Sequence, residues 1–159
     1  PTGKPENLLP FITQTAMGAR SNVTVFGNDY PTRDGTCIRD YIHVVDVAKA
    51  HVTALERLLH HKQQTSYEYF NIGTGEGYSV LEAIRAFEDA TGIQVPYELG
   101  ERRPGDVTQV YADTTKANQE LGWYAERSLP NMMATAWEWE KARHQASATA
   151  PPSVQSPEN

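Results

Sequence analysis

The sequence predicts an α/β fold in which short strands alternate with amphipathic helices. Apolar residues recur at the spacing of a helix face in several segments, and short runs rich in valine, threonine and aromatic residues lie between them. Glycine, proline, asparagine and aspartate separate the two kinds of segment. A chain of 159 residues can bury one sizeable core. We therefore expect one domain with small mixed sheets and several helices.

Two helices and two strands are expected in the first half of the chain. Asn7 is a candidate N-cap for a helix that ends near residues 18–20, and residues 23–26 form a short strand. Alternation over residues 38–45 predicts a second strand, and Asp46 is placed to cap a helix that runs to residue 59. The apolar face of this helix is broad, which is typical of a deeply covered helix.

The second half is expected to contain two further strands and three helices. Residues 67–72 (YEYFNI) and 93–99 are the predicted strands. Ser79 and Glu82 form a capping box that begins a helix, and Gly92 ends it. The remaining signals are a short helix capped by Asp113 and ending at Gly122, a last helix that starts at Ser128, and a Pro/Ser/Ala-rich tail over residues 145–159 that is expected to be disordered.

Composition and charge exclude several classes of function. The net charge of −6 argues against broad contact with nucleic acid, although it leaves room for a local basic site. No run approaches the roughly 20 apolar residues that cross a bilayer, so no membrane partner is expected. Cys37 is the only cysteine, so no internal disulfide can form, and the cytoplasm is the favoured compartment.

Two charged turns carry the residues best suited to an anionic ligand. Arg39 lies in the stretch RDGTCIRDYIHVVD, two residues before Tyr41, and Arg103 and Asp106 lie in the turn ERRPGD. Arginine can offer parallel N–H donors to phosphate oxygens, and a carboxylate can accept hydrogen bonds from sugar hydroxyls. These types suit a ribose-phosphate group. Read alone, they leave open that both are solvated surface turns.

Other kinds of site find less support in the sequence. GTGEG (73–77) precedes a helix as a dinucleotide-binding loop does, but the third glycine of that motif would fall at Tyr78. The histidines lack metal-site spacing, apart from the adjacent pair His60 and His61, and no Gly-x-Ser-x-Gly motif marks a nucleophile. We interpret GTGEG as a tight turn into the next helix, and we expect no metal.

Several longer segments carry a family resemblance. They are NLLPFI (7–12), VFGNDYPTRDGTCIRDYIHVVDVAKAH (25–51), FNIGTGEGYSV (70–80), RRPGDV (102–107) and ADTTKANQELGW (112–123). They resemble the C-terminal half of the UDP-glucose 4-epimerases, which are extended short-chain dehydrogenases/reductases that act on UDP-sugars. The pattern RDYIHV occurs across nucleotide-sugar enzymes, whereas GNDYPTRDGTCIRDYIHV is more specific to the epimerases.

The resemblance implies a division of labour between two halves. In the family, the N-terminal Rossmann half binds NAD and carries a catalytic Tyr-x-x-x-Lys pair. The reaction there proceeds through a 4-keto sugar intermediate. This sequence contains no such pair. Residues 1–144 are thus expected to be the UDP-sugar-binding domain of a homodimeric enzyme that interconverts UDP-glucose and UDP-galactose in galactose metabolism, with NAD bound by the absent half and no activity in this chain alone.

The resemblance also assigns roles to residues of this chain. The diphosphate and nucleotide are expected at the start of the first helix, uracil at the first strand, and the diphosphate, sugar and ribose at the two charged turns. In that order the residues are Asn7 and Leu8; Thr24, Val25 and Phe26; Arg39 and Tyr41; and Arg103 and Asp106. Two alternatives remain: the substrate domain of another nucleotide-sugar dehydratase or reductase, and a non-catalytic nucleotide-binding module.

Val110 departs from the pattern of some family members, which place a bulky tyrosine there beside the sugar. A smaller side chain would leave room near the 2-position of the hexose. UDP-N-acetylhexosamines are therefore expected as possible further substrates.

The family also predicts where apolar surface should be uncovered. Segments of the C-terminal half pack against the NAD-binding half in these enzymes, and residues 44–59 and 69–72 are expected to do so. We therefore expect exposed apolar surface on this chain, with a tendency to associate or to be marginally stable.

Overall fold

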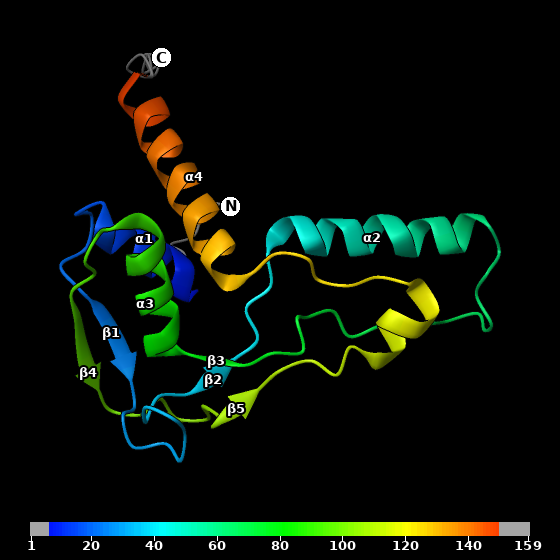
Figure 1. Cartoon of the computed structure of the whole chain (residues 1–159), viewed down its shortest axis with the longest axis horizontal. Helices are drawn as coiled ribbons and strands as arrows, with labels where there is room; N and C mark the ends of the chain where they lie inside the picture. Colours follow the sequence, from blue (N-terminus) through cyan, green and yellow to red (C-terminus); the bar gives the residue numbers. More distant parts are fainter. Residues whose placement is uncertain (1–6, 150–159) are drawn as a thin grey trace, which may run out of the picture.

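The α/β class is confirmed by the structure, a computed structural model that describes residues 7–149 (Figure 1). Short strands and helices alternate along the chain. In chain order the elements are α1 (Leu8–Ala16), β1 (Val23–Phe26), β2 (Ile38–Arg39), α2 (Val44–Leu59), β3 (Tyr78–Ser79), α3 (Val80–Thr91), β4 (Tyr97–Gly100), β5 (Gln109–Val110), the π-helix η1 (Ala117–Leu121) and α4 (Leu129–Thr149). Within the described residues no helix is both long and apolar enough to cross a membrane.

Two small sheets organise the strands. In the first, β1 and β4 are parallel, with Val23 opposite Tyr97 and Phe26 opposite Gly100. In the second, β2 lies between β3, which runs antiparallel to it, and β5, which runs parallel to it. Each strand of this second sheet is only two residues long, so its ladder supplies few hydrogen bonds and other contacts must fix its position.

The main core lies where α1, α3 and α4 cover the first sheet, and we call these helices with β1 and β4 the body (Figure 1). Phe87 is fully buried there, and its ring meets Trp137 of α4 edge-on at 5.9 Å between centroids. Such an aromatic pair adds about 0.5–1.5 kcal/mol to the burial itself. The other buried members of this core are Ile12, Val23, Val25, Ala83, Ile84, Val95, Leu129 and Met133.

A second region reaches away from the body, and we call it the arm: residues 44–72, which include α2, and residues 112–125, which include η1 (Figure 1). Its small core contains Ala50, Ala117 and Trp123. Arg57 also binds both carboxylate oxygens of Glu68, at 2.8 and 2.9 Å, which ties α2 to the segment that follows it. The arm therefore depends on polar contacts as well as on packing.

The outer face of α2 is uncovered, as expected from the family resemblance. Its exposed apolar side chains are Val44, Val45, Val52, Leu55, Leu58 and Leu59. Tyr67 and Tyr69 add further exposed aromatic surface beside it. The expected exposure of apolar surface is confirmed, whereas self-association stays a prediction.

The strand predicted over residues 38–45 is wrong beyond Arg39, and so is the predicted cap of the next helix. Helix α2 begins at Val44, and His43 caps it by accepting a hydrogen bond from the amide of Val45. Asp46 instead lies within the first turn, fully buried, where it accepts hydrogen bonds from the amides of Glu126 and Arg127 and pairs with the Arg127 guanidinium. Asp46 thereby joins α2 to the segment that leads into α4.

Two other strand predictions are also wrong, one entirely and one in part. Residues 67–72 form no strand. The strand predicted over 93–99 begins only at residue 97, and β4 continues to residue 100. The segment 67–72 has aromatic and apolar residues, but a strand also requires a hydrogen-bonded neighbour, and none of the described strands pairs with it.

The local signals at the two ends of α3 are confirmed. Ser79 and Glu82 make the predicted capping box, and Gly92 ends α3 in the left-handed conformation. Asp113 accepts from the amide of Thr115, but the N-cap of η1 is Lys116, so the predicted cap at Asp113 is displaced from the helix start. Asn7 is the N-cap of α1 by position, but its side chain makes no capping hydrogen bond. Helix α4 continues to Thr149, past the predicted boundary at residue 145, and residues 150–159 of the predicted disordered tail lie outside the described residues.

Candidate functional site

A cavity of about 670 Å³ lies where α1, β1, the end of β2 and the turn after β4 meet. Arg39 and Arg103, which are far apart in the sequence, both line it. The candidates on its wall are Asn7, Leu8, Thr24, Phe26, Arg39, Tyr41, Arg103 and Asp106. The fold therefore brings the two charged turns to one cavity.

The side chains of strand β1 are divided between the cavity and the core. Thr24 and Phe26 line the cavity, Val23 is in the core and also borders the cavity, and Val25 is fully buried in the main core. This alternation follows from the pleat of a strand. The Val25 side chain is therefore not on the cavity wall, although its backbone belongs to the strand that is.

Arg39 is held in place by oxygens on three residues. Its Nη1 donates to the carbonyls of Ile38, at 2.8 Å, and Val107, at 2.9 Å, and its Nη2 donates to Asp106 Oδ1 at 2.5 Å. Arginine has five N–H donors. The Nε–H and the second Nη2 hydrogen have no acceptor among residues 7–146, so the guanidinium is fixed in position with two donors to spare.

Arg103 is placed by stacking rather than by hydrogen bonds. Its guanidinium carbon lies 3.9 Å from the centroid of the Phe26 ring. Its neighbour Arg102 stacks on Tyr30 in a similar way, but it also pairs with Asp29 at 2.6 Å and does not line the cavity. Within the described part of the chain, Arg103 has no ion pair and no side-chain hydrogen bond, so its donors are available to an anion.

Two further polar groups on the cavity wall, Asp106 and Tyr41, can form hydrogen bonds with a ligand. Asp106 uses Oδ1 for Arg39, which leaves Oδ2 able to accept from another group. Burial raises the pKa of Tyr41, and the nearby Cys37 adds to this effect, so the phenol stays protonated at neutral pH. Burial likewise raises the pKa of the Cys37 thiol. Tyr41 can therefore act as a neutral hydrogen-bond donor on the wall.

Val110 does not line this cavity. It borders a second hollow of about 550 Å³, together with residues 70–72 and 111–113. Arg39 and Asp40 line both hollows, so the two adjoin at these residues. Val110 is half exposed.

Sequence reasoning missed several residues of the cavity. Leu9, Pro10, Phe11, Val23, Cys37, Asp40, Ile42, Val80 and Met132 also line it. Most are apolar residues of elements whose periodicity marks them as core, so no local signal separates them from buried neighbours. Asp40 had a signal, because it directly follows Arg39 in the stretch that the sequence singled out.

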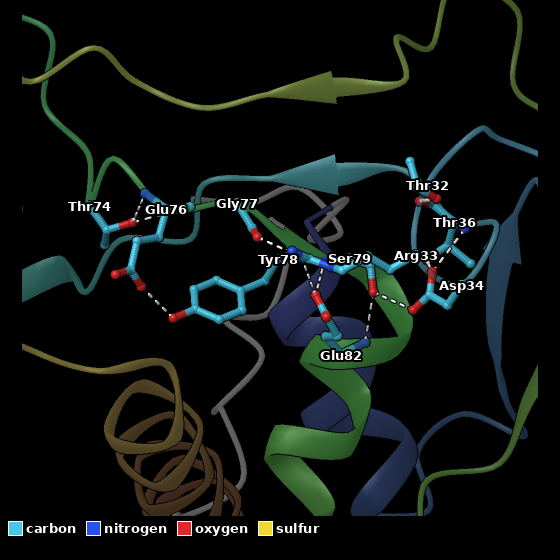
Figure 2. A network of polar contacts seen from close by, with 10 residues as sticks. All are labelled: Thr32, Arg33, Asp34, Thr36, Thr74, Glu76, Gly77, Tyr78, Ser79 and Glu82. Atoms are coloured by element: carbon cyan, nitrogen blue, oxygen red, sulfur yellow. Dashed lines mark hydrogen bonds and ion pairs between the residues drawn. The ribbon is translucent and has the colours of Figure 1, made fainter.

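A polar network fixes the loop that leads into β2 (Figure 2). Asp34 accepts from the amide and hydroxyl of Thr36, at 3.0 and 2.8 Å, and from the Ser79 hydroxyl at 2.5 Å. Arg33 pairs with Glu82 at 2.6 Å and donates to the Gly77 carbonyl. The start of α3 and the loop before Arg39 are thus held together.

Neither alternative kind of site gains support. Among residues 7–146 no group of three or more His, Cys, Asp or Glu residues is arranged to hold a metal ion. The GTGEG loop is packed against the protein: a Cβ at Gly73 would lie 2.3 Å from Asp40 Oδ2 and 2.5 Å from Ala112 Cβ. Gly73 is therefore buried against Asp40 and Ala112, whereas Gly75 and Glu76 of the same loop are exposed.

Comparison with known proteins places the chain among nucleotide-sugar enzymes. The family model described as GDP-mannose 4,6 dehydratase matches residues 2–136. The chain is 51% identical over 142 residues to a UDP-glucose 4-epimerase of Bacillus subtilis, covering 89% of this chain and 41% of that protein. It therefore spans less than half the length of the curated relatives that it matches.

Solved structures agree with this placement. A UDP-glucose 4-epimerase from Stenotrophomonas maltophila with bound NAD and formylated UDP-arabinopyranose has a TM-score of 0.86 and 49% identity, over 92% of this chain and 43% of that one. The enzyme from Bifidobacterium longum, in complex with NAD+ and UDP, has a TM-score of 0.80 and 45% identity, over 91% and 42%. The chain belongs to the family whose model is described as GDP-mannose 4,6 dehydratase, and the relatives named above are UDP-glucose 4-epimerases.

Proposed function

We propose that this chain binds the UDP part of a UDP-sugar in the cavity between Arg39 and Arg103. The observation that carries the proposal is the convergence of two guanidinium groups, both with unused N–H donors, on one cavity. A diphosphate is the ligand that such a pair suits, because charge-assisted hydrogen bonds to phosphate are short and about twice as strong as neutral ones.

The other wall residues suit the remaining parts of UDP. Phe26 offers an aromatic ring and Thr24 a hydroxyl on the face of β1 that lines the cavity, which is the proposed position of uracil. The free Oδ2 of Asp106 can accept from ribose hydroxyls while Oδ1 remains with Arg39. Asn7 and Leu8, at the start of α1, complete the wall beside the nucleotide.

The reaction proposed for the whole enzyme is the interconversion of UDP-glucose and UDP-galactose, as part of galactose metabolism in the cytoplasm. The UDP-glucose 4-epimerase of Bacillus subtilis is identical to this chain at about half of the aligned residues, and two solved UDP-glucose 4-epimerases contain NAD. The residues of this chain do not fit NAD, since the one glycine-rich loop lacks the dinucleotide spacing and packs on Asp40. We therefore propose that NAD, the catalytic Tyr-x-x-x-Lys pair and the homodimer contact reside outside this chain, which is inactive alone.

Calorimetric titration with UDP tests the binding proposal. Removing a charge-assisted hydrogen bond should cost roughly 1.5–3 kcal/mol, so the double variant Arg39→Ala, Arg103→Ala should bind UDP ~100-fold or more weakly. Arg102→Ala is the matched control, because Arg102 is a stacked arginine next in sequence that lies off the cavity wall. Equal affinity in the wild type and the double variant would remove the site assignment.

We further propose that the hollow beside Val110 admits the sugar, and that the small valine tolerates an N-acetyl group at the hexose 2-position. The half-exposed valine borders this hollow next to Arg39, where the diphosphate would end. UDP-N-acetylhexosamines would then be substrates of the whole enzyme as well as the UDP-hexoses.

Epimerase rates on both substrate pairs test the sugar proposal in the full-length protein. Val110→Tyr should lower kcat/KM for the UDP-N-acetylhexosamine pair about tenfold or more relative to the UDP-hexose pair, since a tyrosine fills the space that an acetyl group needs. Val110→Thr, which has similar volume, is the control and should leave the ratio unchanged. An unchanged ratio in the tyrosine variant would contradict the proposal.

A further inference from the structure

Asp40 is the most heavily hydrogen-bonded carboxylate on the cavity wall, and the proposed recognition of UDP does not use it. Its oxygens accept from the Thr74 hydroxyl at 2.6 Å, from the Thr74 amide at 2.9 and 3.1 Å, and from the amides of Gly75 at 3.1 Å and Ala112 at 3.2 Å. These donors belong to two segments far apart in the sequence: the GTGEG loop and the residues after β5. One side chain thus connects the end of β2 to the loop before β3 and to the segment after β5.

Such a connection is needed at this point because β2 is too short to set its own position. It contributes two residues to the sheet, and its continuation to β5 is a backbone hydrogen bond from the Asp40 amide to the Val110 carbonyl at 3.1 Å. In a sheet of two-residue strands, a slip of one residue would turn Arg39 to the other face. The Asp40 carboxylate opposes that slip, because its partners lie on both neighbouring segments.

The packing around Asp40 is close enough to require glycine at position 73 and a carboxylate at position 40. A Cβ at Gly73 would approach Asp40 Oδ2 to 2.3 Å, so the loop can reach the carboxylate only because residue 73 is glycine. The donors are two kinds of group, backbone amides and one hydroxyl, and the amides cannot reverse their role. An asparagine at position 40 would direct an NH2 group toward amide donors, which leaves donors unpaired and costs free energy.

We propose that Asp40 is a positioning residue for Arg39: it acts on diphosphate binding by holding β2 in register and does not itself touch the ligand. This inference rests on the proposed function, because it concerns the same UDP site. The Asp40 carboxylate locks the GTGEG loop and the end of β5 around the residue that follows Arg39. The guanidinium, which lines the cavity, is then held against Ile38, Val107 and Asp106 with two N–H donors left for a ligand.

A double-mutant cycle on UDP affinity separates positioning from general support of the fold. Asp40→Asn should weaken UDP binding by ~10- to 100-fold in the wild-type background, which corresponds to one charge-assisted hydrogen bond. In the Arg39→Ala background the same change should cost less than about twofold, because the group that Asp40 positions is gone. An equal loss in both backgrounds overturns the proposal.

Two further variants guard against a trivial loss of structure. Thr74→Val keeps the shape of the side chain and removes its hydroxyl, which donates to Asp40 at 2.6 Å and accepts from the Glu76 amide at 3.1 Å. It should give a smaller loss of affinity that also disappears in the Arg39→Ala background. Asp34→Asn is the matched control, since Asp34 also accepts three hydrogen bonds from the protein but lies off the cavity wall. If Asp34→Asn weakens UDP as much as Asp40→Asn does, the proposal is wrong.

A measurement without ligand keeps this inference distinct from the proposed function. The guanidinium protons of Arg39, which bond to Asp106 and two carbonyls, should exchange with solvent several-fold faster in Asp40→Asn than in the wild type or Asp34→Asn. Unchanged exchange overturns the positioning role. If Arg39 exchanges faster in Asp40→Asn than in the wild type, but the wild type binds no UDP, the proposed function fails while the role of Asp40 in placing Arg39 stands.

Discussion

The body and the arm of this molecule carry similar helical apolar patterns but differ in how those patterns are covered. In the body, α3 buries Ala83, Ile84 and Phe87 almost completely against α4 and the first sheet. In the arm, Leu55 of α2 is 54% exposed and Leu59 is 65% exposed. The pattern identifies which face of a helix is apolar, whereas the burial depends on what lies opposite that face.

The body and the arm are stabilised by different kinds of contact. The body is a packed core that also forms one wall of the cavity, through α1 and β1. The arm is held by a small cluster and by ion pairs such as Arg57 with Glu68, and it is joined to the start of α4 by buried Asp46. Stability should therefore respond strongly to core substitutions in the body and weakly to substitutions on the apolar face of the arm.

The largest expected contrast is between Phe87→Ala and Leu55→Ala. Truncating the fully buried Phe87 should lower the free energy of unfolding by about 3–5 kcal/mol, because it leaves a cavity in the main core. Truncating Leu55 on the uncovered face should change it by less than about 0.5 kcal/mol. Urea denaturation measures both values, and a similar loss in the two variants would mean that the face of α2 is covered in solution.

A smaller effect is expected where the two regions join. Asp46→Asn removes the charge that pairs with Arg127 and weakens the hydrogen bonds from the amides of Glu126 and Arg127. The expected loss of stability is about 1.5–3 kcal/mol, the size of a hydrogen bond to a charged group. Hydrogen exchange should show faster opening of α2 with little change in α3, and equal acceleration in both helices would contradict a separate arm.

Acidification should produce the mildest change, and it should differ between the regions. The hydrogen bonds from Arg57 hold the pKa of Glu68 at about 2, well below its ordinary value of 4.5. A carboxylate with a lowered pKa stabilises the fold above its unfolded pKa, and this contribution is lost as pH falls from about 4.5 through about 2. The stability of Glu68→Gln should therefore fall less than that of the wild type across this range, as measured by urea unfolding at several pH values.

Asp34, in the loop before β2, provides the corresponding test outside the arm. Burial alone would raise its pKa, but hydrogen bonds from Ser79 and Thr36 outweigh that effect and lower it. Its stabilising contribution is also lost as pH falls below its ordinary value of 3.8. If Glu68→Gln and Asp34→Asn both leave the pH dependence of stability unchanged, these carboxylates are not the groups responsible for it.

The parts of the fold that the sequence predicted are those that depend on near neighbours. The capping box of Ser79 and Glu82 and the left-handed Gly92 involve residues within one turn of each other. The strand predicted over 67–72 failed because strands form only by pairing, and no described strand pairs with that segment. Asp46 was predicted as a helix cap, but a residue 81 positions away, Arg127, determines where its side chain lies.

At the candidate site, too, the sequence predicted the residue types but not their arrangement in space. Residue types alone identified Arg39 and Arg103 as suited to phosphate, but their convergence on one cavity is a property of the fold. Asp40 had a signal in its position next to Arg39, but its role could not be predicted, because its partners are mainly backbone amides, which every residue except proline has. Val25 was included with its strand, although the pleat turns its side chain into the core.

A crystal structure of this chain with UDP would test the central claim most directly. The account predicts that the diphosphate lies between Arg39 and Arg103, with N···O distances of about 2.7–2.9 Å, and that uracil lies beside Phe26 on β1. Arg39 should keep its contact with Asp106 while its two spare donors bind phosphate oxygens. A diphosphate bound elsewhere on the molecule, with both guanidinium groups as they are in the free chain, would contradict it.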